Sequence, residues 1–350
     1  MALLQSEALH PYTDDSPAAG TYAELKRLVK EHGLLDKKIA GYMVRVAIVQ
    51  LMFVGSLATL ALVHIFWLQC LNAVFLAFTS TQVGLIGHDA GHRQVFDSTR
   101  NNDILGMLQG NLLLGMSFSW WNDKHNAHHS KPNEIDTDPD ISVPMIAFTR
   151  EDAMKRRGVF RFMTKHQVWF FVPILMLVGL ALQVNSVKFL FQGGSKRPRA
   201  EAALLVLHYA WYFGLIFTVL PVWQGLVFIA IHKLINGLYL GSVFAPNHKG
   251  MLMTESGSEI DFLRRQVLTA RNVRGNPFTD YWYGGLNYQI EHHLFPSMPR
   301  HNLGKAQRII RAFCEEHAIS YHETSTLRSY YEIMTYLHEI GAPLRAKVAA

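Results

Sequence analysis

Long apolar runs alternate with short polar segments along this chain. Residues 46–63, 68–87, 202–220 and 222–231 are nearly free of charged side chains. A helix needs about 20 apolar residues to cross the hydrocarbon core of a bilayer. The pattern therefore predicts an all-α, polytopic membrane protein.

The first two predicted spans form a pair. The first runs from about Tyr42 to Val63 and the second from about Leu71 to Ile86, with a tight turn at residues 66–69. The second span leads directly into His88 and His92. We therefore expect these two histidines at a membrane boundary.

An amphipathic segment precedes the first span. Thr21 and Glu24 match a capping box and predict a helix that starts at Thr21. One side of this helix is apolar, with Leu25 and Val29, and the other is basic. Two interpretations remain open, an ordinary surface helix and a helix that lies on the bilayer.

Two further apolar segments are not expected to cross the membrane. Residues 104–119 are short and contain Asn111 and three glycines, so they predict an embedded or interfacial helix. Residues 167–184 have basic residues on both sides, which favours a re-entrant or in-plane hairpin. Four true spans remain, with both termini on the cytoplasmic side.

The last predicted span, residues 222–243, carries His232, Lys233 and Asn236. Ionisable groups at mid-membrane are costly and usually functional. We favour a helix that projects beyond the bilayer by two or three turns, and we expect Pro246 to interrupt it.

Three regions follow from these boundaries. Residues 1–40 are a cytosolic or interfacial segment, residues 41–249 a membrane domain, and residues 250–350 a polar cytosolic cap, with residues 41–305 forming one catalytic unit. Within the cap, Asn302 is expected to cap one helix and another should run from Thr326 to Ile340.

Composition narrows the class of function. The 350 residues are 49% hydrophobic and 17% charged, with a formal charge of +6. No nucleic-acid-binding module is evident, and two distant cysteines provide neither a disulfide framework nor a cysteine metal site. Two interpretations remain open for Arg264, Arg265, Arg271 and Arg274, an ordinary solvated face and a surface that attracts an acidic electron donor or an anionic acyl carrier.

Histidines recur in three groups at helical spacing. Residues three or four apart share one face of a helix, so each group presents convergent nitrogen ligands. The groups are His88/His92, then His125/His128/His129, then His292/His293 with Gln289 ahead of them. Seven imidazoles exceed what one ion would use with a position left open for substrate, so two metal ions are implied. Imidazole suits iron, zinc, copper and nickel alike.

The three histidine groups, called boxes below, resemble those of the membrane fatty acid desaturases, and the resemblance covers roughly residues 80–305. The flanking sequences also match, namely Trp121-Asn-Asp-Lys-His-Asn126, Asp138-Pro-Asp140 and Gly284-Gly-Leu-Asn287. Gln289 followed by Ile-Glu-His-His-Leu-Phe-Pro is typical of the front-end branch, which inserts a double bond between an existing one and the carboxyl end. Many such enzymes carry a fused b5-type cytochrome domain with His-Pro-Gly-Gly. Here Tyr12-Thr13 follows His10-Pro11.

The resemblance implies a catalytic site with two iron ions and O₂ as co-substrate. Its metal ligands would be the seven box histidines, His88, His92, His125, His128, His129, His292 and His293, which also form the catalytic set. His248 would be a further ligand just past the last span. Gln289 either coordinates a metal directly or holds a ligating water. Asp89, Asp123, Asp138 and Glu291 are candidate acceptors that orient the imidazoles.

The implied reaction is the oxygen-dependent dehydrogenation of an acyl chain to a cis alkene. The acyl group would be carried by coenzyme A, a carrier protein or a membrane lipid. Electrons would come from a separate donor, a ferredoxin or a b5-type cytochrome with its reductase. Phe118, Trp120 and Trp121 are candidates for the wall of the acyl tunnel. The site would face the cytoplasm, at the plasma membrane in a bacterium.

Two other functions compete with this interpretation. A di-iron acyl or lipid hydroxylase would use the same ligands. A histidine-rich metal transporter would instead place its ligands at mid-membrane on broken helices, whereas the histidine groups here fall at span ends and in polar stretches.

Overall fold

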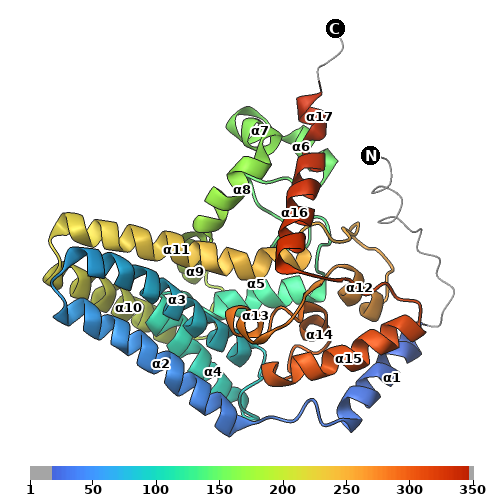
Figure 1. The fold of residues 1–350 in the computed structure, drawn as a ribbon, viewed down its shortest axis with the longest axis horizontal. Helices are drawn as coiled ribbons and strands as arrows, with labels where there is room; N and C mark the ends of the chain where they lie inside the picture. The colour runs from blue at the N-terminus through green and yellow to red at the C-terminus, as the bar shows by residue number, and fades with distance from the viewer. Residues whose placement is uncertain (1–17, 347–350) are drawn as a thin grey trace.

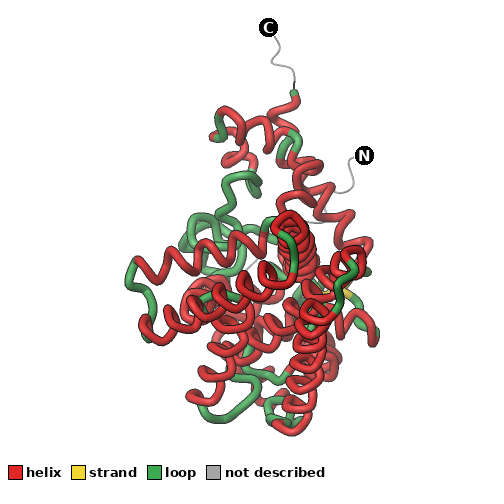
Figure 2. The backbone as a smooth tube through the Cα atoms, turned by 90° about the vertical axis from the view of Figure 1, so that its left-hand side faces the viewer, coloured by secondary structure: helices red, strands yellow, loops and turns green. Residues whose placement is uncertain are grey.

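The computed structural model describes residues 18–346, and helices dominate this part of the chain (Figures 1 and 2). Four of them are long and apolar enough to cross a membrane: α2 Ile39–Leu62, α3 Phe66–Gly91, α10 Pro198–Val219 and α11 Val222–His248. They run side by side in Figure 1. The four predicted spans are therefore confirmed as helices of the right length and polarity.

The turn between α2 and α3 is shorter than predicted. It comprises residues 63–65, whereas Phe66–Gln69 already belongs to α3. The Gln69 side chain explains the tight connection, because its Nε2 donates to the carbonyl oxygens of Thr59 and Val63 at 3.1 and 2.5 Å. The Thr59 carbonyl also accepts from the Val63 backbone N–H at 3.0 Å, whereas the Val63 carbonyl lies beyond the end of α2.

Residues 104–119, predicted to form one embedded or interfacial helix, form separate helical stretches. Helix α4, Thr99–Met107, continues into the π-helix η1, Leu108–Leu114, and α5 begins only at Phe118. Gly115 stops η1 with a φ of 70°, and a Cβ there would lie 2.3 Å from the His208 ring. None of these helices is long enough to span a bilayer, which agrees with the predicted embedded position.

Residues 167–191 form two helices, α8 Gln167–Met176 and α9 Val178–Phe191, which meet at 63°. The bend packs against the middle of α11, where a Cβ on Gly237 would lie 2.1 Å from the Met176 carbonyl oxygen. A break at this point was predicted. That the pair re-enters the membrane stays a prediction, since a bent span has the same hydropathy.

Helix α11 does not stop at Pro246. It continues to His248, so the predicted interruption is wrong. Proline lacks the N–H that would bond the carbonyl of Ser242 four residues earlier. The Tyr330 hydroxyl donates to that carbonyl instead, at 3.1 Å.

The C-terminal part is a layer of shorter helices: α12 Phe262–Leu268, α13 Pro277–Trp282, α14 Gln289–Leu294, α15 Arg300–Glu316, α16 Thr326–Ile340 and α17 Ala342–Arg345. Strands β1 Asn272–Val273 and β2 Glu323–Thr324 pair in parallel. The prediction for α16 is confirmed, with Ser325 as its N-cap. Asn302 is not a cap, since it is buried within α15 and donates to the Leu34 carbonyl at 2.9 Å.

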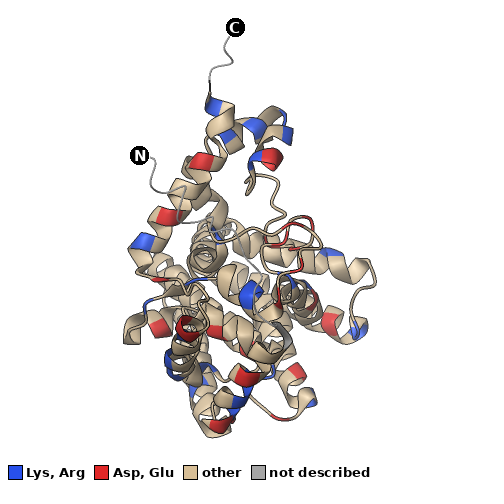
Figure 3. Cartoon of the chain, turned by 90° about the vertical axis from the view of Figure 1, so that its right-hand side faces the viewer, with Lys and Arg blue, Asp and Glu red and all other residues tan. Residues whose placement is uncertain are grey.

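Helix α1, Ala18–Glu31, covers this layer. It is already formed three residues before Thr21, so the predicted start is wrong. Leu25 and Val29 are buried in one cluster with Leu303 and Ile310 of α15. The apolar face of α1 therefore contacts protein, as expected of a surface helix. Lys, Arg, Asp and Glu are interspersed over the side that Figure 3 shows.

Two small helices, α6 Arg150–Lys155 and α7 Gly158–Lys165, lie between α5 and α8. They pack near α16 and α17 at the upper edge of Figure 1.

Candidate metal centre

Helices α3 and α5 bring the first two histidine groups together. His88 lies in the last turn of α3 and His92 directly follows that helix. Gly91 permits the close approach, because a Cβ there would lie 2.3 Å from the Trp121 ring of α5. Trp121 in turn stacks on His125, with ring centroids 4.5 Å apart.

The third group arrives on a short helix held by a tight turn. Gly284 and Gly285 have φ values of 61° and 86°, a region that favours glycine. The turn leads into α14, whose Ile290 N–H donates to the Asn272 side chain at 3.0 Å. His292 and His293 are thereby buried against the ends of α3 and α5.

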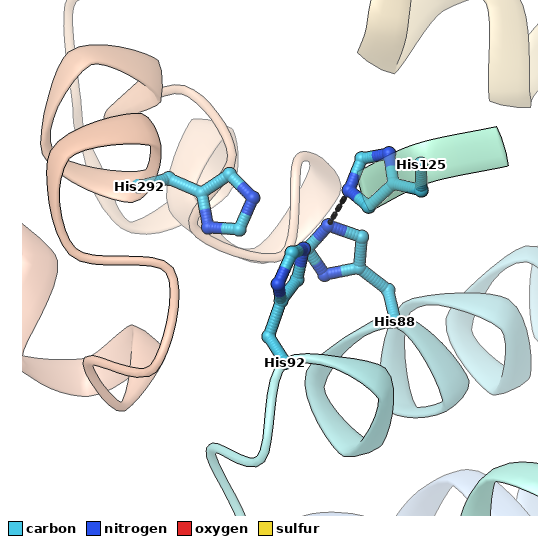
Figure 4. Close-up of side chains that lie close together, drawn as sticks. All are labelled: His88, His92, His125 and His292. Carbon is cyan, nitrogen blue, oxygen red and sulfur yellow. Dashed lines mark hydrogen bonds between the residues drawn. The ribbon is translucent and has the colours of Figure 1, made fainter. Parts of the chain in front are cut away.

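The histidines sort into two sets. The first is His88, His92, His125 and His292, whose ligand nitrogens all lie within 4.8 Å of one another (Figure 4). The second is His128, His248 and His293, within the same limit. His129 lies between the sets, since its ring centroid is 4.6 Å from that of His92 and 4.1 Å from that of His293. The structure thus brings together every predicted histidine.

Hydrogen bonds fix the tautomers of the second set. Each Nδ1 faces an oxygen that can only accept: Asp138 for His128 at 3.0 Å, the Thr269 carbonyl for His248 at 2.9 Å, and Gln266 Oε1 for His293 at 2.8 Å. Each Nδ1 therefore carries the proton, and each Nε2 presents a bare lone pair. The Nε2 atoms of His128 and His248 nevertheless face each other at 3.3 Å.

Two facing lone pairs repel, so this geometry suits a cation between them. In the first set the Nε2 atoms of His88 and His125 also approach each other, at 3.2 Å. Both nitrogens of His292 and the Nε2 atoms of His92 and His293 are buried without a hydrogen-bond partner. Burial of unpaired polar nitrogens is costly, and metal coordination would satisfy them. The donor set fits two metal ions.

The electrostatics agree with metal binding. Burial, followed by the neighbouring imidazoles, holds the pKa values of His125, His129, His292 and His293 well below the usual range. These residues are therefore neutral at pH 7, which is the form that binds a metal.

Gln289 lies beside His248. Its Nε2 is 2.9 Å from His248 Nε2, and its Oε1 accepts a hydrogen bond from Asn247 at 2.9 Å. In this orientation the amide N–H group points at the lone pair that a metal would use. Half a turn about the last side-chain bond would exchange the two atoms and present the oxygen instead.

Of the four carboxylates predicted to orient the imidazoles, two contact a histidine and two do not. Asp138 holds His128, and its pKa is lowered because the His128 bond and charge outweigh its burial. Asp89 lies 3.4 Å from His88 Nδ1. Asp123 is exposed, and Glu291 bonds Asn272 and Tyr321 instead of an imidazole, so these two predictions are wrong. Burial raises the pKa of Glu291 to about 7.

Two positioning residues were missed by sequence reasoning. Gln266 accepts from His293 and donates to the His129 carbonyl at 2.9 Å, so it bridges two boxes. Arg300 pairs with Asp89, which contacts His88. Neither residue shares a helical repeat with a histidine, and no local pattern marks either of them.

The predicted arginine surface does not form as a unit. Arg265 is buried against Glu134 at 2.6 Å, and Arg271 is buried against Glu332. Arg264 pairs with Asp261, while the Arg274 side chain is 70% exposed. Buried, paired cations cannot meet a partner protein, so the prediction is wrong for Arg265 and Arg271.

A cavity that is partly open to solvent, with about 750 Å³ of empty space including its open mouth, reaches this cluster from between the long helices. His88 and Trp121 line its end near the histidines, and Leu76 and Phe53 line its deeper part. Phe118 lines a smaller neighbouring cavity, whereas Trp120 lines neither. Two of the three predicted wall aromatics are thus confirmed as cavity-lining residues.

Comparison with known proteins decides the family. The fatty acid desaturase family profile matches residues 40–325. The chain belongs to the fatty acid desaturase family. Its relatives include an acyl-lipid (9-3)-desaturase of Physcomitrium patens, 31% identical over 91% of this chain and 62% of its own length. A delta(6)-fatty-acid desaturase of Caenorhabditis elegans is 33% identical over 81% of this chain and 68% of its own length.

A delta(5) fatty acid desaturase of Caenorhabditis elegans is 30% identical over 94% of this chain and 76% of its own length. These relatives are front-end members of the desaturase family. The chain spans somewhat less than two thirds of the Physcomitrium patens relative, and more of the other two.

Proposed function

We propose that the chain is an oxygen-dependent acyl desaturase that introduces a cis double bond in front of an existing one. The observation that carries this proposal is the pair of converging imidazole sets at the end of an apolar cavity. The cavity suits an acyl chain, because its wall is largely hydrocarbon. The similarity to acyl-lipid (9-3)-, delta(6)- and delta(5)-desaturases supports the same activity.

His88, His92, His125 and His292 would hold one iron ion and His128, His248 and His293 the other, with His129 between them. Gln289 would hold a ligating water or coordinate directly. When bound, the two ions supply the oxidising chemistry, using O₂ and two external electrons. Asp138, Gln266 and the Thr269 carbonyl keep the Nδ1 protons in place and so aim the Nε2 lone pairs.

The protein's own part is to position the chain and exclude water. Trp121 lies against His88 at 5.2 Å between centroids and lines the cavity beside it. An acyl chain in the cavity would therefore pass close to the first imidazole set. The surrounding apolar wall would keep bulk water from the reacting carbons.

The charge distribution supports a cytoplasmic site. The loops at the far ends of the spans, residues 63–65 and 220–221, contain no Lys or Arg, whereas Lys37, Lys38 and Arg197 lie at the ends near the histidines. The positive-inside tendency then places the histidine cluster and the C-terminal layer in the cytoplasm. A separate ferredoxin or b5-type cytochrome would deliver electrons from that side.

A product analysis tests the proposed function. We expect membranes of a host expressing this chain to gain an acyl chain with a new double bond nearer the carboxyl end. Mass spectrometry of dimethyl-disulfide adducts would locate the bond, and the purified protein should contain two iron ions per chain. A hydroxylated acyl product would overturn the proposal in favour of the hydroxylase.

A substitution at Gln266 tests whether this residue positions the metal ligands. Gln266→Leu removes the acceptor that fixes the His293 tautomer and the donor to the His129 carbonyl. We expect a loss of about 10- to 100-fold in iron affinity or activity. Gln266→Glu keeps the acceptor and should recover part of both. Equal losses in the two variants would contradict a role through the tautomer of His293.

A further inference from the structure

One wall of the large cavity is polar at membrane depth. Tyr212 of α10 and His232, Lys233 and Asn236 of α11 line it, together with Ser80 of α3. Helix α11 has 27 residues, about 40 Å of helix against about 30 Å of hydrocarbon. Its length would allow a projection at the His248 end, which stays a prediction, and would still leave these side chains within the span.

Most of these polar groups satisfy one another. The Tyr212 hydroxyl bonds His232 Nδ1 at 2.7 Å, and His232 Nε2 bonds Ser80 Oγ at 3.2 Å. Asn236 donates to Thr81 Oγ1 at 2.9 Å. This network is closed within α3, α10 and α11, and it needs no ligand.

Lys233 lies outside this hydrogen-bond network. Its Nζ lies 4.5 Å from the centroid of the Tyr212 ring. No carboxylate in the described residues 18–346 forms an ion pair with it. A desolvated cation over the face of an aromatic ring is stabilised by roughly 2 kcal/mol. The lysine therefore already uses one π face and presents its remaining side to the cavity.

The distance to the histidines indicates which part of a substrate Lys233 would meet. Ser80 precedes His88 by eight residues on α3, which is about 12 Å of helix. His232 bonds Ser80, and Lys233 follows it on α11. An acyl chain that passes His88 and runs along the cavity would therefore meet Lys233 about 12 Å beyond the reacting carbons.

An acyl chain has few groups to offer a cation at that depth. Methylene and methyl groups have no concentrated electron density, and the ester or thioester end carries a polar carrier that would stay outside the bilayer. A carbon–carbon double bond does present π electrons. We propose that Lys233 binds a pre-existing double bond of the acyl substrate and so selects unsaturated chains over saturated ones. This inference rests on the proposed desaturase function.

The test compares substrates within one membrane. A host expressing the chain is supplied with equal amounts of saturated, monounsaturated and diunsaturated fatty acids of one length, and conversion of each is measured by mass spectrometry. For Lys233→Met, which keeps the length of the side chain, we expect the ratio of unsaturated to saturated conversion to fall roughly tenfold. Lys233→Arg should keep the ratio within about twofold, since it retains the cation.

The control is Leu226→Met, a volume-conserving change at an exposed position of the same helix outside the cavity, which should leave the ratio unchanged. Loss of this half-buried lysine, which has no ion-pair partner among residues 18–346, should leave the protein folded, because burial of an uncompensated charge is costly. An unchanged ratio in Lys233→Met, an equal fall for all substrates, or acceptance of longer chains at a constant ratio would each overturn the inference. A wild type that converts no acyl chain would instead refute the proposed function.

Discussion

The His292→Ala variant should lose both its iron and its desaturation product. His292 is fully buried, and neither of its nitrogens has a protein partner. Its ring lies 4.7 to 4.8 Å from those of His88, His92 and His129. Removal of a group that merely orients a ligand already costs about 10- to 100-fold. We therefore expect loss of a ligand to cost more than about 100-fold in activity.

Two measurements separate this outcome from unfolding. Iron content by atomic absorption should fall, while the elution profile and melting temperature of the detergent-solubilised protein stay near those of the iron-free wild type. His338→Ala changes an exposed histidine on α16 and should leave iron and product unchanged. Full iron occupancy in His292→Ala would show that the first set is not a metal site.

The Arg300→Met variant should be strongly destabilised. Arg300 is buried at the start of α15, where it pairs with Asp89 and donates to the Leu85 carbonyl at 2.6 Å. Its backbone N–H donates to the Tyr42 hydroxyl at 3.1 Å. One residue thus ties the C-terminal layer to α2 and α3. Removing one partner of a buried pair leaves the other charge uncompensated and typically costs about 3–5 kcal/mol.

A double-mutant cycle isolates the pair. If the cost comes from the stranded Asp89 carboxylate, Asp89→Asn combined with Arg300→Met should be more stable than Arg300→Met alone. Denaturant unfolding in one detergent gives the four free energies, and Arg308→Met changes an exposed arginine of the same helix as the control. If Arg300→Met costs no more than Arg308→Met, the pair is not a structural link.

The iron content of the protein should also fall in the Arg300→Met variant. Asp89 lies beside His88 Nδ1, so an unpaired Asp89 can shift toward that imidazole. We expect His88 to be held less precisely and the first set to bind iron more weakly. This effect should persist at temperatures where the variant is still folded.

Local pattern was most informative along single helices. The apolar runs predicted four spans that the structure contains, because hydrocarbon requires both length and apolarity. The spacing within each histidine group predicted convergent ligands, because residues three or four apart share a helical face. The same logic explains the error at Asp123, which is two residues from His125 and therefore points away from its face.

The ends of helices were predicted less well. The run of α11 through Pro246 and the position of Asn302 depend on partners distant in sequence, and the turn after α2 depends on a side chain of the next helix. Gln69, Tyr330 and Leu34 supply them. A terminal carbonyl accepts from whichever donor the tertiary fold brings near, and a side-chain amide donates to whichever acceptor lies near it. No local rule names that partner.

The sequence by itself determined the membrane helices, the three histidine groups and the family resemblance, since each depends on residue type and spacing within one segment. Only the tertiary structure decided how the histidines divide into two sets, that Gln266 and Arg300 support them, and that Lys233 faces the cavity. The physical reason is that periodicity gives the direction of a side chain relative to its own helix. The side chain that it meets is set by how the helices pack.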